Sequence, residues 1–301
     1  MKKFIKKIAL YLVVFVILGN LIGLLCQYFM ASSQFYKPNY VVNALDSSTN
    51  YDYFIVGSSR GLTTVDSKQI DQSLNTNGIN LSMADTDLKT QLLMVKHFYN
   101  SGYSSKNCIL VLDKSHYTET YKELGGNDYR FIGYGRRDYI NEHYDKYETG
   151  TIKPLSLSNY FPFAGFAYFN LELFLPSGLA ALKPDFRNKF DDRGNYSYPN
   201  QNLTAPQAIR RSTTAIINNP LVKEMAALTA QYNTKLTIYI APYINESQNV
   251  FVEDIDASII NQSDQFVGKE HLFYDDLHVT TIGREVATTA LIPELKKTLK
   301  Q

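Results

Sequence analysis

The sequence predicts an α/β fold with a mostly parallel sheet, and two patterns in the chain support this. Short apolar runs bounded by turn residues are typical of buried parallel strands. Four such runs lie at 53–56, 78–81, 108–112 and 236–240. Segments with the apolar spacing of a helix lie between these runs or after them, most clearly from Leu88 to Tyr99 and from about Thr281 to Leu299. This alternation of strands and helices favours a layered α/β architecture.

The composition is that of a folded chain with one sizeable domain or two small ones. The 301 residues are 45% hydrophobic and 20% charged, and the formal net charge is +1. These values exclude disordered, collagen-like and coiled-coil proteins, and the near-zero charge argues against a nucleic-acid partner. Two cysteines, Cys26 and Cys108, are too few for a disulfide scaffold or a four-cysteine zinc site, so we expect free thiols.

The N-terminal segment has the properties of a membrane anchor. Residues 8–25 contain one strongly polar side chain, that of Asn20. Eighteen helical residues reach about 27 Å, close to the ~30 Å hydrocarbon core of a bilayer. Four lysines precede this run and none directly follows it, which favours a cytoplasmic N-terminus and an extracytoplasmic body. A cleaved signal peptide is the open alternative.

These patterns suggest a division of the chain into three regions. We expect a cytoplasmic tip and transmembrane anchor over residues 1–30, a juxtamembrane linker over 31–50, and an extracytoplasmic domain over 51–301. Residues 114–204 interrupt the strand–helix rhythm, and we interpret them as an insertion at the carboxyl ends of the strands, where open α/β sheets bind ligands. Residues 205–232 have helical apolar spacing, with Pro220 restarting the helix.

The insertion is rich in tyrosine and arginine. Arg136, Arg137 and the tyrosines around them can form a substrate-binding wall, because aromatic faces stack on sugar rings. Ordinary packing of an irregular insertion is the alternative interpretation. The tyrosines concerned are Tyr129, Tyr134, Tyr139 and Tyr144.

Two short motifs near opposite ends of the body carry the chemistry. Ser59 lies in a Gly-Ser-Ser turn after the first strand, so its hydroxyl can project above the sheet edge. Asp275 and His278 precede the last helix. An Asp three residues before a His lies on the same side of one helical turn, so its carboxylate can accept the Nδ1–H of the imidazole and direct Nε2 at a nucleophile. In a parallel sheet both motifs fall at the carboxyl edge. We therefore predict a Ser59–His278–Asp275 catalytic triad.

With these motifs the body resembles the SGNH (GDSL-like) hydrolase superfamily. The family's Gly-Asp-Ser block corresponds to Gly57-Ser58-Ser59, and its Asp-x-x-His block corresponds to Asp275 and His278. The resemblance implies a three-layer αβα, flavodoxin-like domain. The Gly-Ser-Ser form behind one N-terminal span is most similar to the membrane-anchored branch of the family. That branch includes the D-alanyl transfer protein of teichoic acid modification and relatives in polysaccharide O-acetylation.

The resemblance also implies an oxyanion hole. Its first donor is the backbone N–H of Ser59, and its second is that of Ser82, which stands where the family has a glycine. The family's Gly-x-Asn-Asp block matches residues 125–128, although twelve residues separate it from the end of the preceding strand. Asn127 is therefore a candidate third donor, with a polar loop as the alternative. Arg60 can contact an anionic substrate, and the alternatives are a salt bridge or a solvated side chain.

The implied function is a serine esterase or O-acyltransferase that acts on acyl esters of a cell-envelope polysaccharide. An acyl donor and a membrane-bound acyltransferase are candidate partners. We expect no cofactor and no metal, since the remaining histidines lack the spacing of metal ligands. Two alternatives stay open, a non-catalytic envelope scaffold on a hydrolase-like fold and a glycan-binding protein.

Overall fold

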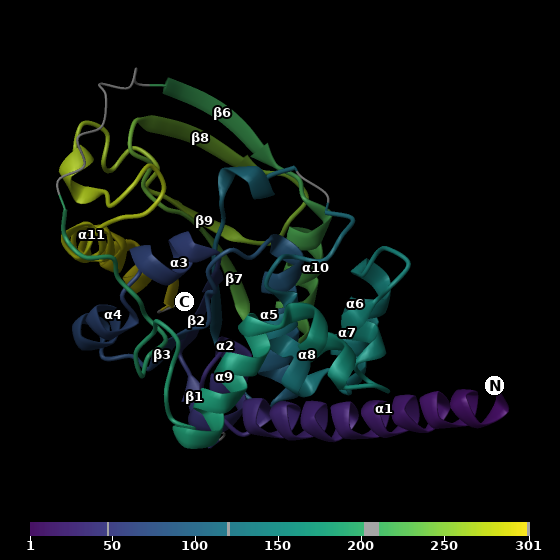
Figure 1. Cartoon of the computed structure of the whole chain (residues 1–301). Coiled ribbons are helices and arrows are strands. Elements are labelled where there is room, and N and C mark those ends of the chain that lie inside the picture. Colours follow the sequence, from purple (N-terminus) through teal and green to yellow (C-terminus); the bar gives the residue numbers. More distant parts are fainter. Residues whose placement is uncertain (47, 119–120, 202–210, 300–301) are drawn as a thin grey trace. The chain divides into compact units, whose positions relative to one another are not determined.

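The chain divides into two structural units, each built from two separate stretches of sequence (Figure 1). The computed structural model describes residues 1–46, 48–118, 121–201 and 211–299. One unit combines residues 1–45 with 122–188, and the other combines 46–121 with 189–301. The second unit carries the sheet and both sequence motifs.

A five-stranded parallel sheet forms the centre of the second unit. Its strands are β2 (Tyr53–Gly57), β3 (Gly78–Asn80), β5 (Asn107–Val111), β7 (Lys235–Ile240) and β9 (Ser258–Asn261). Their order is β3-β2-β5-β7-β9, and every neighbouring pair is parallel. Numbered along the chain this order is 2-1-3-4-5, which is the order of one common doubly wound sheet. The α/β class and the four predicted strands are therefore confirmed.

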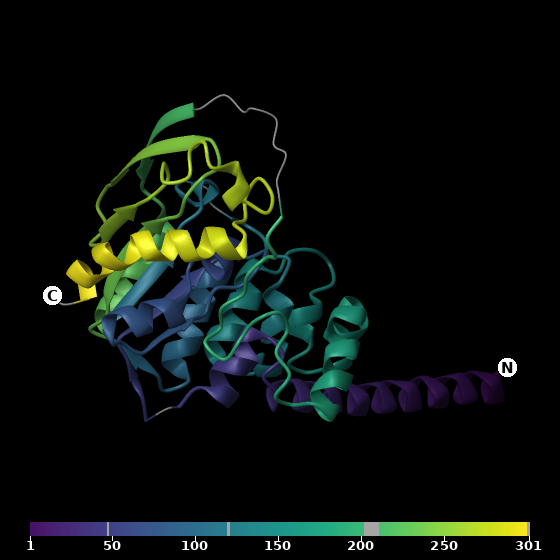
Figure 2. The same ribbon diagram turned by 90° about the vertical axis from the view of Figure 1, so that its left-hand side faces the viewer.

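Helices cover both faces of this sheet (Figures 1 and 2). On one face lie α3 (Ser59–Thr64), α4 (Ser67–Leu74) and α11 (Thr281–Leu299), and on the other α5 (Leu88–Asn100) and α10 (Pro220–Gln231). Alternate residues of β2 serve the two layers. Ile55 joins the apolar cluster that includes Leu291 of α11, while the Phe54 ring lies 4.7 Å from that of Phe98 in α5.

Several strands were not predicted. β6 (Arg211–Ile217) and β8 (Glu246–Val252) pair in parallel as a separate sheet, β1 (Asn50–Tyr51) pairs with β4 (Ser104–Ser105), and β9 extends the main sheet. The helix predicted over 205–232 is wrong across β6, where the β-branched residues Thr213, Thr214, Ile216 and Ile217 favour a strand. α10 does begin at Pro220 as predicted. Residues 202–210 lie outside the described residues.

Two short 3₁₀ helices belong to the second unit as well. η1 (Lys114–His116) follows β5, and η3 (Glu270–Leu272) precedes α11.

The first unit is helical in the residues that the structure describes. Its elements are α1 (Lys2–Ala31), α2 (Lys37–Ala44), η2 (Asp128–Tyr134), α6 (Asp138–Tyr147), α7 (Pro154–Leu157), α8 (Phe163–Phe169) and α9 (Leu171–Leu182). By length and composition, α1 is long and apolar enough to cross a membrane. The predicted linker over 31–50 is corrected, because α2 lies within it and buries Tyr40 and Val41. The predicted insertion over 114–204 is also corrected. Its residues 122–188 belong to this unit, and the residues on either side of them belong to the second unit.

Most of the tyrosines predicted to face a glycan are instead packed inside the first unit. Tyr129, Tyr134 and Tyr144 are each at most 8% exposed, and burial raises the pKa of Tyr134 to about 12. The Arg137 guanidinium lies 4.6 Å from the centre of the Tyr134 ring and donates to the Tyr139 hydroxyl at 3.1 Å. Ordinary packing, the alternative interpretation, therefore holds for these tyrosines.

Asn80 ties the sheet to the helix that carries Ser59, so its removal should destabilise the second unit. Its fully buried side chain donates to the Gly61 carbonyl at 3.0 Å and accepts the Ser82 N–H at 3.0 Å. Because Asn80→Ala leaves both groups buried and unpaired, we expect it to lower the free energy of unfolding by about 1–3 kcal/mol in urea denaturation. The control is Asn100→Ala at the exposed end of α5, and an equal effect of the two substitutions would contradict this role.

Candidate active site

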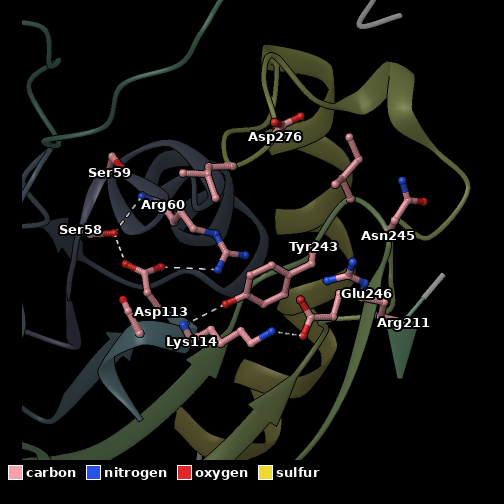
Figure 3. A pocket seen from close by; sticks show the side chains of 13 residues that line it. Ser58, Ser59, Arg60, Asp113, Lys114, Arg211, Tyr243, Asn245, Glu246 and Asp276 are labelled. Carbon is pink, nitrogen blue, oxygen red and sulfur yellow. Dashed lines mark hydrogen bonds and ion pairs between the residues drawn. The ribbon is translucent and has the colours of Figure 1, made fainter. Parts of the chain in front are cut away.

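Ser59 lies at the carboxyl edge of the sheet because β2 turns directly into α3. β2 ends at Gly57, and the Ser58 hydroxyl caps the helix by accepting the Arg60 N–H at 3.3 Å. Ser59 is then the first helical residue, and its side chain points away from that of Ser58 (Figure 3). The predicted tight turn after a buried strand is present.

His278 is held by a turn between η3 and α11. The Tyr274 N–H donates to the His278 carbonyl at 2.7 Å, and Asp275 Oδ1 accepts the N–H groups of Leu277 at 2.9 Å and His278 at 2.8 Å. The Asp-x-x-His segment is therefore a side-chain-stabilised turn, and the helical turn assumed from the spacing is corrected. The predicted contact between the carboxylate and the imidazole is nevertheless present, since His278 Nδ1 lies 2.8 Å from Asp275 Oδ2.

The structure brings the three predicted triad residues together. His278 Nε2 lies 2.8 Å from Ser59 Oγ, although 219 positions separate the two residues in the sequence. This distance is within the range of hydrogen bonds between a nucleophile and its base. The His278 side chain is 15% exposed and that of Asp275 is 46% exposed, so the imidazole is the better shielded of the two.

Asp275 is held in its ionised form. Partial burial by itself would raise the pKa of this carboxyl, but hydrogen bonds from the His278 ring and from the N–H groups of Leu277 and His278 outweigh it. The pKa of Asp275 therefore lies below its ordinary value. The ionised carboxylate holds the proton on Nδ1 of His278 and leaves Nε2 to accept one.

An aromatic pair that sequence reasoning missed lies beside the imidazole. The Tyr198 ring centre is 5.1 Å from that of His278, and Tyr274 stacks on Tyr198 at 4.4 Å. The Thr281 N–H donates to the Tyr198 carbonyl at 2.9 Å, which joins this segment to the start of α11. Tyr198 comes from a stretch without strand or helix periodicity, so no pattern in the sequence indicated its place.

A cavity of about 650 Å³ opens beside Ser59, a size typical of small-molecule sites. In Figure 3, Ser58 and Ser59 lie on one side, Glu246 and Arg211 lie on the other, and the Arg60 side chain extends between them to the Tyr243 ring. Glu246 accepts from Lys114 Nζ at 2.6 Å and Thr213 Oγ1 at 3.0 Å. The lining residues are Ser58, Ser59, Arg60, Asp113, Lys114, Ser115, Arg211, Tyr243, Ile244, Asn245, Glu246, Asp276 and Leu277.

Asp113 is a second site residue that sequence reasoning missed. It follows β5 directly, and its carboxylate accepts a short hydrogen bond from the Ser58 hydroxyl and lies 3.4 Å from Arg60 Nη1. A signal for it was available, because β5 lies beside β2 and the carboxyl ends of parallel strands meet at one edge. Asp113 thus anchors the residue before Ser59, and among the residues that the structure describes no hydrogen bond joins its carboxylate to the triad.

Arg60 lines the cavity, and contacts with neighbouring segments hold its side chain in place. Its side chain is buried, and Nη2 donates to the carbonyls of Ala241 at 2.9 Å and Pro242 at 2.7 Å. The guanidinium also lies 3.8 Å from the centre of the Tyr243 ring. Of the alternatives predicted from the sequence, the salt bridge is the one observed, with Asp113, and the burial of Arg60 excludes a solvated side chain. Arg60 also joins α3 to the end of β7.

The predicted role of Ser82 in the oxyanion hole is wrong. Its N–H donates to Asn80 Oδ1 at 3.0 Å, and the residue is fully buried, so this N–H is already used. Asn127, Arg136 and Arg137 belong to the first unit, whereas the triad belongs to the second. In the first unit the Asn127 carbonyl accepts the Arg130 N–H at 3.1 Å, and Arg136 is exposed. The roles predicted for these three residues stay predictions.

No protein-family model matches the chain, and no curated protein matches it. The resemblance to SGNH hydrolases therefore depends on the two motifs and on their positions in the fold. Among the described residues, no group of three or more His, Cys, Asp or Glu side chains is arranged to hold a metal ion.

Gly283 allows α11 to begin close to the loop that carries His278, so Gly283→Ala should disturb both. A Cβ at this position would lie 2.1 Å from the Leu272 carbonyl oxygen and 2.9 Å from Val279 Cβ, and the backbone would have to move. We expect a clear fall in the melting temperature, measured by thermal unfolding. The matched control is Gly126→Ala, whose Cβ would meet no atom within 4 Å. Equal melting temperatures for the two variants would contradict the close approach.

Proposed function

We propose that this chain is a membrane-anchored serine esterase or O-acyltransferase of the SGNH type that acts on acyl esters of a cell-envelope glycan. One observation carries the proposal. Ser59 Oγ lies 2.8 Å from His278 Nε2, the opposite ring nitrogen lies 2.8 Å from Asp275, and Ser59 lines a cavity of about 650 Å³. A nucleophile, a base and a group that orients the base are the parts that acyl transfer requires.

In the first half-reaction, Ser59 Oγ attacks the carbonyl carbon of the acyl ester while its proton moves to His278 Nε2. The ionised Asp275 stabilises the imidazolium that forms. The tetrahedral intermediate then collapses. The bond between the carbonyl carbon and the leaving alcohol breaks, His278 returns its proton to that alcohol oxygen, and the acyl group stays on Ser59.

In the second half-reaction, an acceptor hydroxyl attacks the acyl-enzyme as His278 takes its proton. The bond from the carbonyl carbon to Ser59 Oγ breaks, and Ser59 recovers its proton from His278. Water as the acceptor makes the protein an esterase, and a sugar hydroxyl makes it an O-acyltransferase. The chemistry of the triad is the same in both cases, so the acceptor depends on what the cavity admits.

The oxyanion hole of this proposal has fewer donors than sequence reasoning assigned. As the first residue of α3, Ser59 has an N–H without a partner inside the helix, and it remains the proposed donor. The Ser82 N–H is occupied. Removal of one oxyanion donor typically costs about 2.7–4 kcal/mol of transition-state stabilisation, so we expect slow turnover of simple esters.

The envelope location rests on the N-terminal segment. α1 is long and apolar enough to cross a membrane, and its four lysines all precede the apolar run. We propose a cytoplasmic N-terminus and an extracytoplasmic body. Outside the membrane a cell-envelope polysaccharide is the substrate or acceptor that we propose, with a membrane-bound acyltransferase as a candidate donor partner.

A non-catalytic envelope scaffold is the second candidate function. The observation that favours it is the occupied Ser82 N–H, which leaves the oxyanion hole weaker than the family pattern implies. A scaffold would keep the fold and lose the need for an activated serine, so ester turnover that depends on Ser59 separates the two candidates.

Substitution of the nucleophile or of its base should abolish ester turnover. We expect Ser59→Ala and His278→Ala to lose hydrolysis of an activated acetyl ester while circular dichroism and melting temperature stay close to wild type. The matched control is Ser73→Ala on the exposed side of α4, which should retain full turnover. Turnover by both triad variants at the wild-type rate would contradict the assignment.

Asp275→Asn should reduce turnover without removing the nucleophile or the base. An amide cannot hold the proton on His278 Nδ1 as a carboxylate does, and such a change in a triad typically lowers kcat by about 10⁴-fold. Ester turnover of the variant and of wild type should be compared between pH 5 and 8, where the lowered pKa of Asp275 keeps the wild-type carboxyl ionised. A variant within a few-fold of wild type would show that Asp275 does not act on the imidazole.

A further inference from the structure

Residues 160–182 of the first unit form an unusually apolar segment that the proposed function does not use. Among these 23 residues Glu172 is the one charged side chain. Large apolar side chains along the segment stand exposed: Tyr160 (80%), Tyr168 (66%), Leu171 (71%), Leu175 (61%) and Leu182 (81%). Water-soluble surfaces rarely leave such a patch uncovered, so it marks a contact surface.

Apart from the exposed Glu172 in its first turn, helix α9 carries apolar side chains on both its inward and its outward side. Leu173, Pro176 and Ala180 face inward and are buried, while Leu171, Leu175 and Leu182 form the outward stripe. A surface helix in water carries polar residues on its outward stripe, whereas a helix that is apolar all round is typical of burial in a core or in lipid. The outward stripe of α9 therefore has the composition of a lipid-facing surface.

The segment is joined to α1 by close backbone contact. A Cβ at Gly23 would lie 2.5 Å from the Phe163 backbone nitrogen, and one at Gly19 would lie 3.2 Å from the Phe163 ring. Asn20 Oδ1 accepts the Phe163 N–H at 3.5 Å, and the Phe15 ring meets that of Phe163 edge-on at 6.1 Å. Two glycines four residues apart provide the notch that lets another backbone approach a membrane helix this closely.

The position of this notch along α1 determines its depth in a bilayer. Lys7 is the last charged residue before the apolar run, and Gly19 and Gly23 follow it by 12 and 16 residues. At 1.5 Å per residue these glycines lie about 18 Å and 24 Å into a hydrocarbon core about 30 Å thick. Tilting of the helix would place them still farther from the distal boundary. If α1 spans, Phe163 must therefore lie inside the hydrocarbon.

We propose that residues 160–182, including α8 and α9, are embedded in the leaflet distal to the N-terminal lysines, with lipid acyl chains covering the outward stripe. α8 begins in the α1 notch, and the Phe174 ring of α9 lies 6.4 Å from that of Phe163. The first unit then has a second membrane contact besides α1. This inference rests on α1 spanning the bilayer, and it is independent of the ester chemistry.

The absence of tryptophan from the chain allows a direct test with the full-length protein in lipid nanodiscs. Single substitutions Leu175→Trp and Tyr168→Trp place a reporter in the segment. Leu12→Trp in α1 is the control for a lipid-facing position, and Phe251→Trp in β8, which is 53% exposed, is the control for a water-facing one. The tryptophan fluorescence of each variant is measured in ordinary lipid, in lipid with brominated acyl chains, and in ordinary lipid with added iodide. Each variant is used only after its melting temperature has been shown to match wild type.

We expect Leu175→Trp and Tyr168→Trp to behave like Leu12→Trp. Brominated acyl chains should quench most of their fluorescence, and iodide should have little effect, whereas Phe251→Trp should show the reverse. Iodide quenching of both segment reporters as strong as that of Phe251→Trp, without quenching by brominated lipid, would overturn the proposal. Protection from both quenchers would overturn it too, since protein and not lipid would then cover the stripe. None of these outcomes depends on ester turnover.

Discussion

The hydrogen bond between Ser59 and His278 is the interaction on which the rest of this account depends. It joins two residues 219 positions apart, and only the tertiary fold brings them together. β2 delivers Ser59 to the carboxyl edge of the sheet, and the turn before α11 delivers His278 to the same place. α3 and α11 pack on one face of the sheet, so the alignment of nucleophile and base is part of the core packing. Such rigid support is what a catalytic geometry needs, because small displacements cost large factors in rate.

Two charged residues near this bond, Arg60 and Asp113, hold the helix that carries Ser59 in place and are not part of the triad. Arg60 joins α3 to the end of β7 through the Ala241 and Pro242 carbonyls, and Asp113 holds the Ser58 hydroxyl. These contacts fix the first turn of α3 from two neighbouring strands. The orientation of Ser59 therefore depends on charged groups that contact neither the imidazole nor the Asp275 carboxylate in the hydrogen bonds described.

Sequence patterns predicted the parts of the fold that follow strong periodicity. Fully buried strands such as β2 and β5 read as continuous apolar runs, and the Gly-Ser-Ser and Asp-x-x-His motifs indicated the triad because parallel strands end at one edge. Partly exposed strands lack such a continuous apolar run, and the spacing of apolar residues across β6 predicts a helix where the structure has a strand. The Ser82 prediction failed because a neighbouring side chain, Asn80, captures the N–H, and no spacing rule reveals that. The joining of residues 1–45 with 122–188 is a long-range contact that local periodicity does not encode.

A serine-reactive fluorophosphonate probe, with the adduct located by mass spectrometry of the full-length protein, is the most direct test of an activated Ser59. A hydroxyl hydrogen-bonded to an imidazole base attacks such a probe, and an ordinary hydroxyl does not. The account predicts a single adduct on Ser59 of the folded wild-type protein, lost when the imidazole of His278 is removed. A folded wild-type protein that takes up no label, or takes it up equally on Ser58, would contradict the account.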